Sequence, residues 1–305
     1  MGNDKIKIIG FEKDLVLWAA EGIGFFAAQD LTVSFDQTRS STEEILGVLQ
    51  GRWDIAFDNG DNVVAWDEGQ GADGTPHDLF IFMGGSQELT QALYVAPDVK
   101  EIRNLKGKVL GVDAVATGYA VVLRYILQCY GLHDRQDYSL LPLGSTKIRV
   151  TKLLEGEISG AMLNPRHVQE IGASSLRQLA RGKDYADPYP ARVGLATRAW
   201  AKDHRGLLIR FVKANFMAAD WILNPENKHD AVALMTTWMG RTNEAAEKDY
   251  NGIVGSEGAL PRRGAFNPSP LNTVLDLRLK TGLMNPPAPP LNKYFDATFY
   301  REASS

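Results

Sequence analysis

The chain has 305 residues, of which 44% are hydrophobic and 23% are charged, and its formal net charge at pH 7 is −4. This composition is typical of a globular protein, and the length is more natural for two domains than for one. The acidic balance argues against nucleic acid or an anionic membrane surface as a partner, because both require a basic face. Direct membrane insertion is not expected either, since no apolar run approaches the ~18–20 residues of a membrane span.

The N-terminal residues show no export signal, because Met1-Gly2-Asn3-Asp4 leads directly into an expected strand at 5–9. We therefore expect a periplasmic protein if a leader has been removed, and a cytoplasmic one otherwise. The single cysteine, Cys129, excludes an internal disulfide and a cysteine-rich metal site. Its helical spacing with Val122 and Ile126 predicts a buried thiol rather than a nucleophile.

Strand-like and helix-like segments alternate from the start of the chain, which predicts an α/β fold with largely parallel sheets. Asp14 is a candidate cap for the first helix, and Ser41-Thr42-Glu43-Glu44 forms a capping box for the second. A third helix is expected to begin near Asn62. The expected strands of this part are 5–9, 31–35, 55–58, 79–83 and 92–96.

The same alternation continues through the middle of the chain. A long helix at 119–130 is expected to end at Gly131, and Ser145-Thr146 is expected to cap another helix. Residues 49–59 and 154–164 repeat one pattern of helix, glycine, short strand and asparagine, which predicts two similar α/β lobes. After 197 the pattern is mostly helical. The expected strands of this part are 108–112, 140–143, 160–163 and 193–197.

A group of polar residues follows the short expected strand at 55–58. Asp58, Asn59, Asp61 and Asn62 stand where this strand gives way to a helix. Ligands of open α/β sheets bind beyond the carboxyl ends of the strands, where helix N-termini present free N–H groups. A turn or a helix cap explains any one of these residues, but the set of four exceeds what one cap needs and favours a ligand site.

Several segments, taken in order, resemble the type II solute-binding proteins of ABC importers, in the branch that binds alkanesulfonates, taurine and thiamine precursors. The segments are LWAAEGIGFFAAQDLTVSF, STEEILGVLQGRWDIAF, EIRNLKGKVLGVDAVATGYAVVLRYILQCYGL, KLLEGEISGAML and VGLATRAWAKDH. The resemblance covers residues 5–282 and implies a two-lobed periplasmic-binding-protein type II fold (a Venus flytrap), each lobe a mixed, mostly parallel sheet flanked by helices. Lobe one would comprise 1–92 and 193–305, lobe two 93–192, with crossing hinge strands near 93–96 and 193–197.

The resemblance also implies a function. A monomer would capture a small polar or anionic organic molecule, aromatic ones included, between the lobes and present it to an ABC permease, with no catalytic residue, metal or cofactor. Hydroxyl groups and backbone N–H groups are suited to an anionic head, and Arg39 is the best-placed cation, although each residue is alternatively a cap or a solvated side chain. The implied contacts are Phe11, Glu12, Arg39, Ser41, Thr42, Asn59, Asp61, Asn62, Gly85, Ser86, Gln87, Ala116, Thr117, Gly118, Tyr119, Ser145 and Asn164.

An enzyme is the main alternative. The same fold hosts pyrimidine synthase of thiamine formation and dihydroxyphthalate-type decarboxylases, so the chain could be a cytoplasmic decarboxylase, lyase or pyrimidine-synthase-like enzyme acting on a small organic acid. Its many carboxylates favour acid–base chemistry. Against this, the cysteine-rich motif of pyrimidine synthase is absent and the five histidines lack metal-ligand spacing. A LysR-type regulator is disfavoured because no N-terminal helix-turn-helix precedes the first strand.

Overall fold

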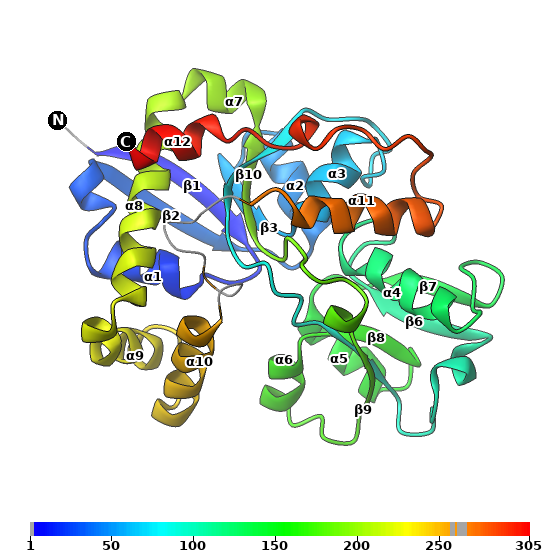
Figure 1. Ribbon diagram of the computed structural model, residues 1–305. Helices are drawn as coiled ribbons and strands as arrows, with labels where there is room; N and C mark the ends of the chain where they lie inside the picture. The colour runs from blue at the N-terminus through cyan, green and yellow to red at the C-terminus, as the bar shows by residue number, and fades with distance from the viewer. Residues whose placement is uncertain (1–2, 257–259, 261–266) are drawn as a thin grey trace.

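The computed structural model describes residues 3–256, 260 and 267–305. It contains two five-stranded sheets flanked by helices, and the two sheets lie in separate halves of an elongated molecule (Figure 1). The two-lobed α/β fold expected from the sequence is thereby confirmed.

The first sheet has the strand order β2-β1-β3-β10-β4. β1 pairs in parallel with β2 and β3, whereas β10 runs antiparallel to both β3 and β4. In the sequence β10 comes after all the strands of the second sheet, and it lies between β3 and β4 in the first sheet. The strands are β1 (Asp4–Gly10), β2 (Leu31–Gln37), β3 (Ile55–Asp58), β4 (Leu79–Gly84) and β10 (Val193–Thr197).

The second sheet has the order β7-β6-β8-β5-β9. β6 pairs in parallel with β7 and β8, and β5 runs antiparallel to β8 and β9. The edge strand β9 was not expected from the sequence. The strands are β5 (Ala92–Val95), β6 (Lys108–Val112), β7 (Tyr138–Pro142), β8 (Gly160–Leu163) and β9 (Arg177–Arg181).

The helices cover both sheets, and the largest group follows β10. The α-helices are α1 (Leu15–Gly22), α2 (Ser41–Leu49), α3 (Gly60–Asp67), α4 (Tyr119–Cys129), α5 (Thr146–Leu154), α6 (Pro165–Glu170), α7 (Arg198–Asp203), α8 (Arg205–Leu223), α9 (Lys228–Thr237), α10 (Asn243–Gly255), α11 (Pro270–Lys280) and α12 (Thr298–Ser304). Short 3-10 turns are η1 (Ala27–Gln29), η2 (Ile102–Leu105), η3 (Gly182–Asp184), η4 (Pro225–Asn227) and η6 (Leu291–Lys293).

Two connections join the sheets and run side by side. Residues 85–91 lead from β4 to β5, and residues 182–192 lead from β9 to β10. Backbone N–H groups of the second connection donate to carbonyls of the first, from Tyr189 to Gln87 and from Arg192 to Ser86, both at 3.0 Å. The strands expected to cross the hinge directly adjoin these connections, while the lobe boundaries at 92/93 and 192/193 stay predictions.

Local expectations are mostly confirmed, with three corrections. Asp14 caps α1 by accepting from the Leu17 N–H. The cap of α2 is Ser40 rather than Ser41, because the Ser40 hydroxyl accepts the Glu43 N–H. The helix after β3 begins at Gly60, two residues before the expected start. Cys129 is exposed rather than buried, because α4 ends at this residue and its side chain leaves the packed face.

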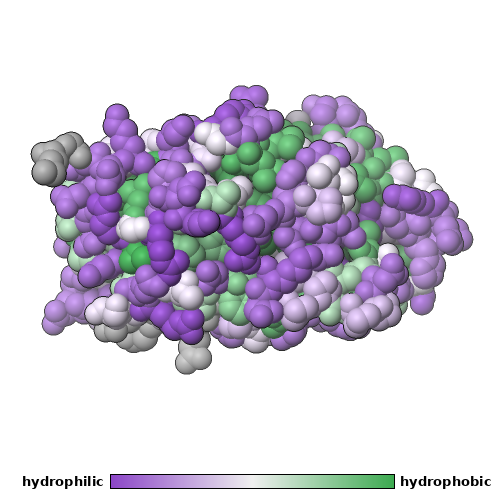
Figure 2. All heavy atoms as spheres, turned by 90° about the horizontal axis from the view of Figure 1, so that it is seen from above, coloured by the Kyte–Doolittle hydropathy of each residue, from purple (hydrophilic) through white to green (hydrophobic). Residues whose placement is uncertain are grey.

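Helix α11 lies against both halves of the molecule (Figure 1). One cluster of buried side chains includes Trp66 of α3, Val274 and Leu277 of α11, and Leu123 of α4. The hydrophobic core is therefore continuous between the lobes on this side. None of the helices in the described residues combines the length and the hydrophobicity of a membrane span. Figure 2 shows a face on which hydrophilic residues predominate.

Candidate functional site

A cavity of about 920 Å³ lies between the two sheets. The first sheet contributes residues that directly follow its strands, such as Phe11 after β1 and Asn59 after β3. The second sheet contributes Asp113 after β6 and Asn164 after β8, together with the first residues of α4 and α5. The walls are thus built from carboxyl ends of strands and N-termini of helices, as the sequence predicted for a ligand site in this class of fold.

The expected contact residues divide into two groups. Those that line the cavity are Phe11, Glu12, Arg39, Asn59, Ser86, Thr117, Gly118, Tyr119, Ser145 and Asn164. Those that are not part of its wall are Ser41, Thr42, Asp61, Asn62, Gly85, Gln87 and Ala116.

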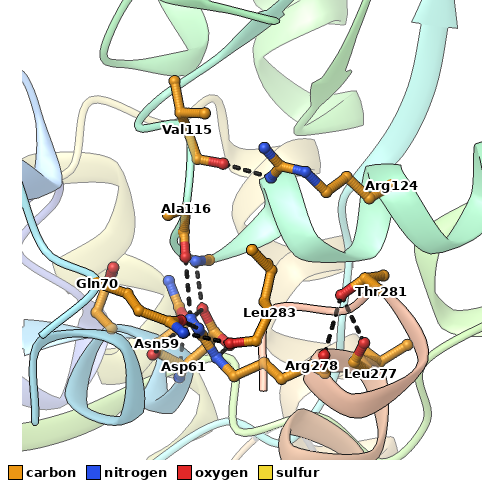
Figure 3. Close-up of polar contacts among 12 residues, drawn as sticks. Asn59, Asp61, Gln70, Val115, Ala116, Arg124, Leu277, Arg278, Thr281 and Leu283 are labelled. Atoms are coloured by element: carbon orange, nitrogen blue, oxygen red, sulfur yellow. Dashed lines mark hydrogen bonds and ion pairs between the residues drawn. The ribbon is translucent and has the colours of Figure 1, made fainter. Parts of the chain in front are cut away.

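Two residues of the second group contact the opposite half of the molecule instead of the cavity. The Asp61 carboxylate accepts from Arg278 Nε and Nη2, both at 2.7 Å, and from the Gly118 N–H at 2.5 Å (Figure 3). The Ala116 carbonyl accepts from Arg278 Nη2 at 3.1 Å. The side chains of Asp61 and Arg278 are almost fully buried. Asp61 and Ala116 therefore join α3 and α11 to the loop that precedes α4.

Among the acidic residues that line the cavity, Asp58 has the pKa that departs most from its ordinary value. Its Oδ1 accepts from the backbone N–H of Asn59 at 2.7 Å and from Asn59 Nδ2 at 3.0 Å, and its Oδ2 accepts from Asn62 Nδ2. Burial raises the pKa of Asp58 to about 7, with a further increase from the nearby charge of Asp113, and the hydrogen bonds from Asn59 and Asn62 only partly oppose this. Asn62 does not line the cavity, but its side-chain amide donates to Asp58, which does.

Glu44 of α2 lies behind Asp58. It is fully buried, and neither carboxyl oxygen has a hydrogen-bond partner among the described residues. Burial, followed by the charges of Asp58 and Asp113, raises the pKa of Glu44 well above its usual range. Two buried carboxyl groups with raised pKa values therefore lie on the first-sheet side, Asp58 on the cavity wall and Glu44 behind it.

Five positively charged residues of the described chain line the cavity, namely Arg39, Lys147, Arg149, Arg192 and Arg241. Apart from Arg241 at the rim, Arg149 and Arg192 are the least exposed of them. Arg149 of α5 is buried, and it donates from Nη1 to the Gly144 carbonyl at 2.9 Å and from Nη2 to Thr146 Oγ1 at 3.1 Å. Burial lowers the pKa of Arg149, but a guanidinium stays protonated in proteins. Within the described part of the chain, Arg149 Nε and Arg192 Nη2 have no hydrogen-bond partner.

Arg192 is held by lobe-one side chains. Its Nε donates to Asp14 Oδ2 at 2.8 Å, and its guanidinium lies 4.0 Å from the centre of the Phe57 ring. Arg39, the cation expected from the sequence, is exposed, and its backbone carbonyl accepts the Ser145 N–H at 2.8 Å. Arg149 and Arg192 were missed by sequence reasoning, although Arg149 stands four residues after Ser145, in the first turn of a helix that begins at a strand end.

Ion pairs connect the two lobes at the rim of the cavity. Arg166 of α6 pairs with Glu12, and Arg241, which follows α9, pairs with Glu170 of α6. Arg166 and Glu170 lie 3.6 Å apart, so these four side chains form one network across the rim. A further contact between the lobes is the hydrogen bond from the Ser41 N–H to Asp113 at 3.2 Å. The lobes thus contact each other at more than one place around the cavity.

Apolar side chains line the space between the charged walls. Phe11 and Phe57 come from the first lobe, and Met162 comes from the second. Tyr119 lines the same cavity, and the centre of its ring lies 5.9 Å from that of Tyr189. These side chains suit a flat or apolar body. No group of histidine, cysteine and acidic side chains suited to a metal ion occurs in residues 3–256, 260 and 267–305.

The architecture defines this molecule as a periplasmic-binding-protein fold of type II. The sequence profile of the NMT1-like family matches residues 13–236, and the chain belongs to this family. The resemblance seen in the sequence is thereby confirmed. No curated protein sequence matches the chain.

Solved structures of several proteins share the fold. The periplasmic nitrate-binding protein NrtA from Synechocystis PCC 6803 has a TM-score of 0.75 at 16% identity, over 99% of this chain and 88% of that one. The alkanesulfonate-binding protein SsuA from Xanthomonas axonopodis pv. citri, bound to MOPS, has a TM-score of 0.71 at 13% identity, over 93% and 96%. The desulfurization enzyme DSZB has a TM-score of 0.63 at 15% identity, over 99% of both chains.

Proposed function

We propose that the protein is the solute-binding component of an ABC importer. It captures a small polar or anionic organic molecule, aromatic ones included, between its lobes and closes over it by a hinge movement of the two connections. The observation that carries this proposal is the cavity itself, whose wall includes the arginines Arg149 and Arg192 beside apolar side chains. Buried or half-buried guanidinium groups beside apolar side chains suit an anionic organic molecule, because hydrogen bonds to a charged partner are the strong ones.

The comparisons support the same role. The family profile covers most of the chain, and NrtA and SsuA are binding proteins for small anions with the same fold. By this analogy the protein acts as a monomer in the periplasm and delivers its solute to a membrane permease.

Thermal unfolding of the purified protein with a panel of sulfonates, aromatic carboxylates and pyrimidines tests the proposal. A solute that binds only the native state raises stability by RT ln(1 + [L]/Kd), about 2.7 kcal/mol at 100 Kd. We expect at least one member to raise the Tm and to be recovered unchanged by mass spectrometry. Arg149→Gln should reduce the shift, whereas Arg177→Gln, an exposed arginine on β9, should not. A panel without any binder would contradict solute binding.

An enzyme acting on a small organic acid is the second candidate. The observation that favours it is Asp58, whose pKa of about 7 suits proton transfer near neutral pH, next to Asp113 and the buried Glu44. DSZB also shows that the fold can carry catalysis. Conversion of a panel member by the protein, abolished in Asp58→Asn, would establish this candidate and displace the binding protein.

A further inference from the structure

Three carboxyl groups lie near one another where the two lobes meet. Glu44 of α2 and Asp58 at the end of β3 belong to the first lobe, and Asp113, directly after β6, belongs to the second. We propose that the lobes close with uptake of protons by these carboxyl groups, so that acid favours the closed form and alkali the open form. This inference rests on the hinge movement of the proposed function and specifies what controls it without a solute.

The second-lobe member of the cluster contacts the first lobe directly. The Asp113 carboxylate accepts the Ser41 N–H, at 3.2 Å from Oδ2 and 3.4 Å from Oδ1. Ser41 is the first residue of α2, and Glu44 lies on the same face of this helix, because residues three positions apart are neighbours on an α-helix. Both residues are buried. Closure therefore brings the charge of Asp113 to a buried carboxyl group of the other lobe.

The first-lobe members are poorly suited to a negative charge. Glu44 is fully buried, and neither of its carboxyl oxygens has a hydrogen-bond partner among the described residues. Asp58 is 8% exposed on the cavity wall. Burial raises the pKa of both groups, and the charge of Asp113 raises both further. Protons on these groups remove the repulsion that the approach of Asp113 creates.

The two arginines near the cluster attract its members equally in both forms. Arg192 opposes the raised pKa of Glu44, but its Nε donates to Asp14 at 2.8 Å, and both acidic partners belong to the first lobe. Arg149 interacts with Asp113, and these two residues belong to the same lobe. Movement of the lobes therefore leaves both attractions in place, whereas it changes the repulsion across the gap.

The remaining titratable groups around the cluster do not produce the same effect. Burial raises the pKa of Tyr119 and of Tyr189, so both phenols stay neutral. Asp61 is neutralised by Arg278. His167 lines the cavity at some distance along the wall, near the rim, and burial lowers its pKa. A proton on His167 would lie beside the positively charged rim arginines, so its contribution is tested separately.

The direction of the pH dependence follows from what the lobes do to Asp58. When they separate, Asp113 leaves Ser41 and water reaches the cavity wall, so the pKa of Asp58 falls from about 7 toward its ordinary value of 3.8. The closed form thus holds a proton that the open form releases. Its advantage is fully present below pH 3.8 and is lost as the pH rises through 7.

Single-molecule fluorescence energy transfer across the rim tests this inference on the full chain without a solute. The dyes are attached through Glu244→Cys in α10 and Ser175→Cys after α6, both exposed positions, in a protein that also carries Cys129→Ser. We expect the closed-to-open ratio to fall about five- to tenfold from pH 5.5 to pH 8, as a difference of about one in a carboxyl pKa between the two forms produces.

Variants show whether the cluster is responsible. Asp113→Asn keeps the size of the side chain and removes its charge, so it should be more closed than the parent at pH 8 and should vary less with pH. Glu44→Gln should act in the same direction, and it replaces Asp113→Asn if that variant does not fold by circular dichroism. Asp98→Asn, an exposed aspartate of the second lobe, and His167→Gln should retain the dependence of the parent.

The outcomes separate this inference from the function on which it rests. A closed-to-open ratio that is constant with pH, or that rises with pH, overturns proton uptake while the hinge movement stands. Equal pH dependence in the parent and in Asp113→Asn overturns the role of the cluster. If the dyes report one fixed distance at every pH, and also with each solute that raises the Tm, the hinge movement of the proposed function fails and the inference fails with it.

Discussion

Asp58, at the end of β3, belongs to the polar wall of the cavity but is buried, and burial opposes the ionisation of its carboxyl group. It lines the cavity, yet its carboxyl group is buried beside Glu44 and Asp113. Its folded-state pKa of about 7 lies above the ordinary value of 3.8, so the native state holds a proton that the unfolded chain releases. The stability that this proton contributes is fully present below pH 3.8 and is lost as the pH rises through 7.

We therefore expect Asp58→Asn to stabilise the fold at alkaline pH. The substitution removes the cost of a buried charge, so the gain in unfolding free energy over the parent should grow by about 2–3 kcal/mol between pH 5 and pH 8. Urea denaturation at both pH values measures it. The control is Asp203→Asn, an exposed aspartate on α7, which should leave the difference near zero. A gain that does not change with pH would show that Asp58 ionises freely in the native state.

Among the helices and strands, α11 joins the two lobes, a role that the sequence does not indicate. Its Arg278 is fully buried, pairs with Asp61 and reaches the Ala116 carbonyl, and Gln70 accepts another of its hydrogen bonds (Figure 3). The helix thereby fixes the start of α3 against the loop before α4. A polar anchor of this kind holds two lobes in register on the side where the hydrophobic core is continuous.

Removing the Arg278 charge should be strongly destabilising. Arg278→Leu leaves Asp61 buried without a counter-charge, and loss of one partner of such a pair costs about 3–5 kcal/mol. Asp61→Asn combined with Arg278→Leu should recover part of this loss, because no uncompensated charge remains. Arg301→Leu, an exposed arginine of α12, is the matched control. Equal stability of Arg278→Leu and Arg301→Leu in urea denaturation would contradict the assigned pairing.

Helices and strands could be predicted from the sequence where a local pattern of apolar residues marks them. β3, β6, β8 and β10 occur at their expected residues because each is a short apolar run bounded by turn residues. β9 was missed because Arg177–Arg181 is a charged edge strand without an apolar run. Asp61 was expected to contact the ligand because it is a polar residue that follows a strand. Its partner is Arg278, 217 residues away in the sequence, and no local pattern indicates this pairing.

At the scale of the whole molecule, the lobes meet through contacts of very different strength. The contacts of Asp61 with Gly118 and of Arg278 with Ala116 are buried, whereas the rim network of Glu12, Arg166, Glu170 and Arg241 is partly exposed. Exposed pairs contribute about 0–1 kcal/mol each and are screened by salt. The rim is therefore the side on which the lobes would separate, with the buried contact as the fixed side.

We expect Arg166→Gln to favour an open form of the ligand-free protein. It breaks the contacts with Glu12 and Glu170, and a loss of up to about 1 kcal/mol raises the open-to-closed ratio up to about fivefold. Small-angle X-ray scattering at low salt should show a larger radius of gyration, and the parent should approach it at high salt. Arg181→Gln, whose ion pair with Asp184 lies within one lobe, is the control. An unchanged radius for Arg166→Gln would mean that the rim pairs do not hold the lobes.

The location of the cavity could be predicted from the sequence, but several charged residues of its wall could not. The rule that ligands bind beyond strand ends selected Phe11, Asn59 and Asn164, and all three line the cavity, while their contact with a ligand stays a prediction. It did not find Arg149 or Arg192, because the burial of an arginine depends on which lobe faces it. A sequence shows an arginine in a helix or a loop in the same way whether water or a cavity surrounds it.

The insertion of β10 between β3 and β4 imposes an order on how the polypeptide is made. During translation the strands β1 to β4 emerge first, but β4 has no neighbour in its own sheet until Val193–Thr197 leaves the ribosome. The intervening lobe, by contrast, contains all of its strands in one uninterrupted stretch of chain. The half synthesised in the middle can therefore mature before the half that was started first.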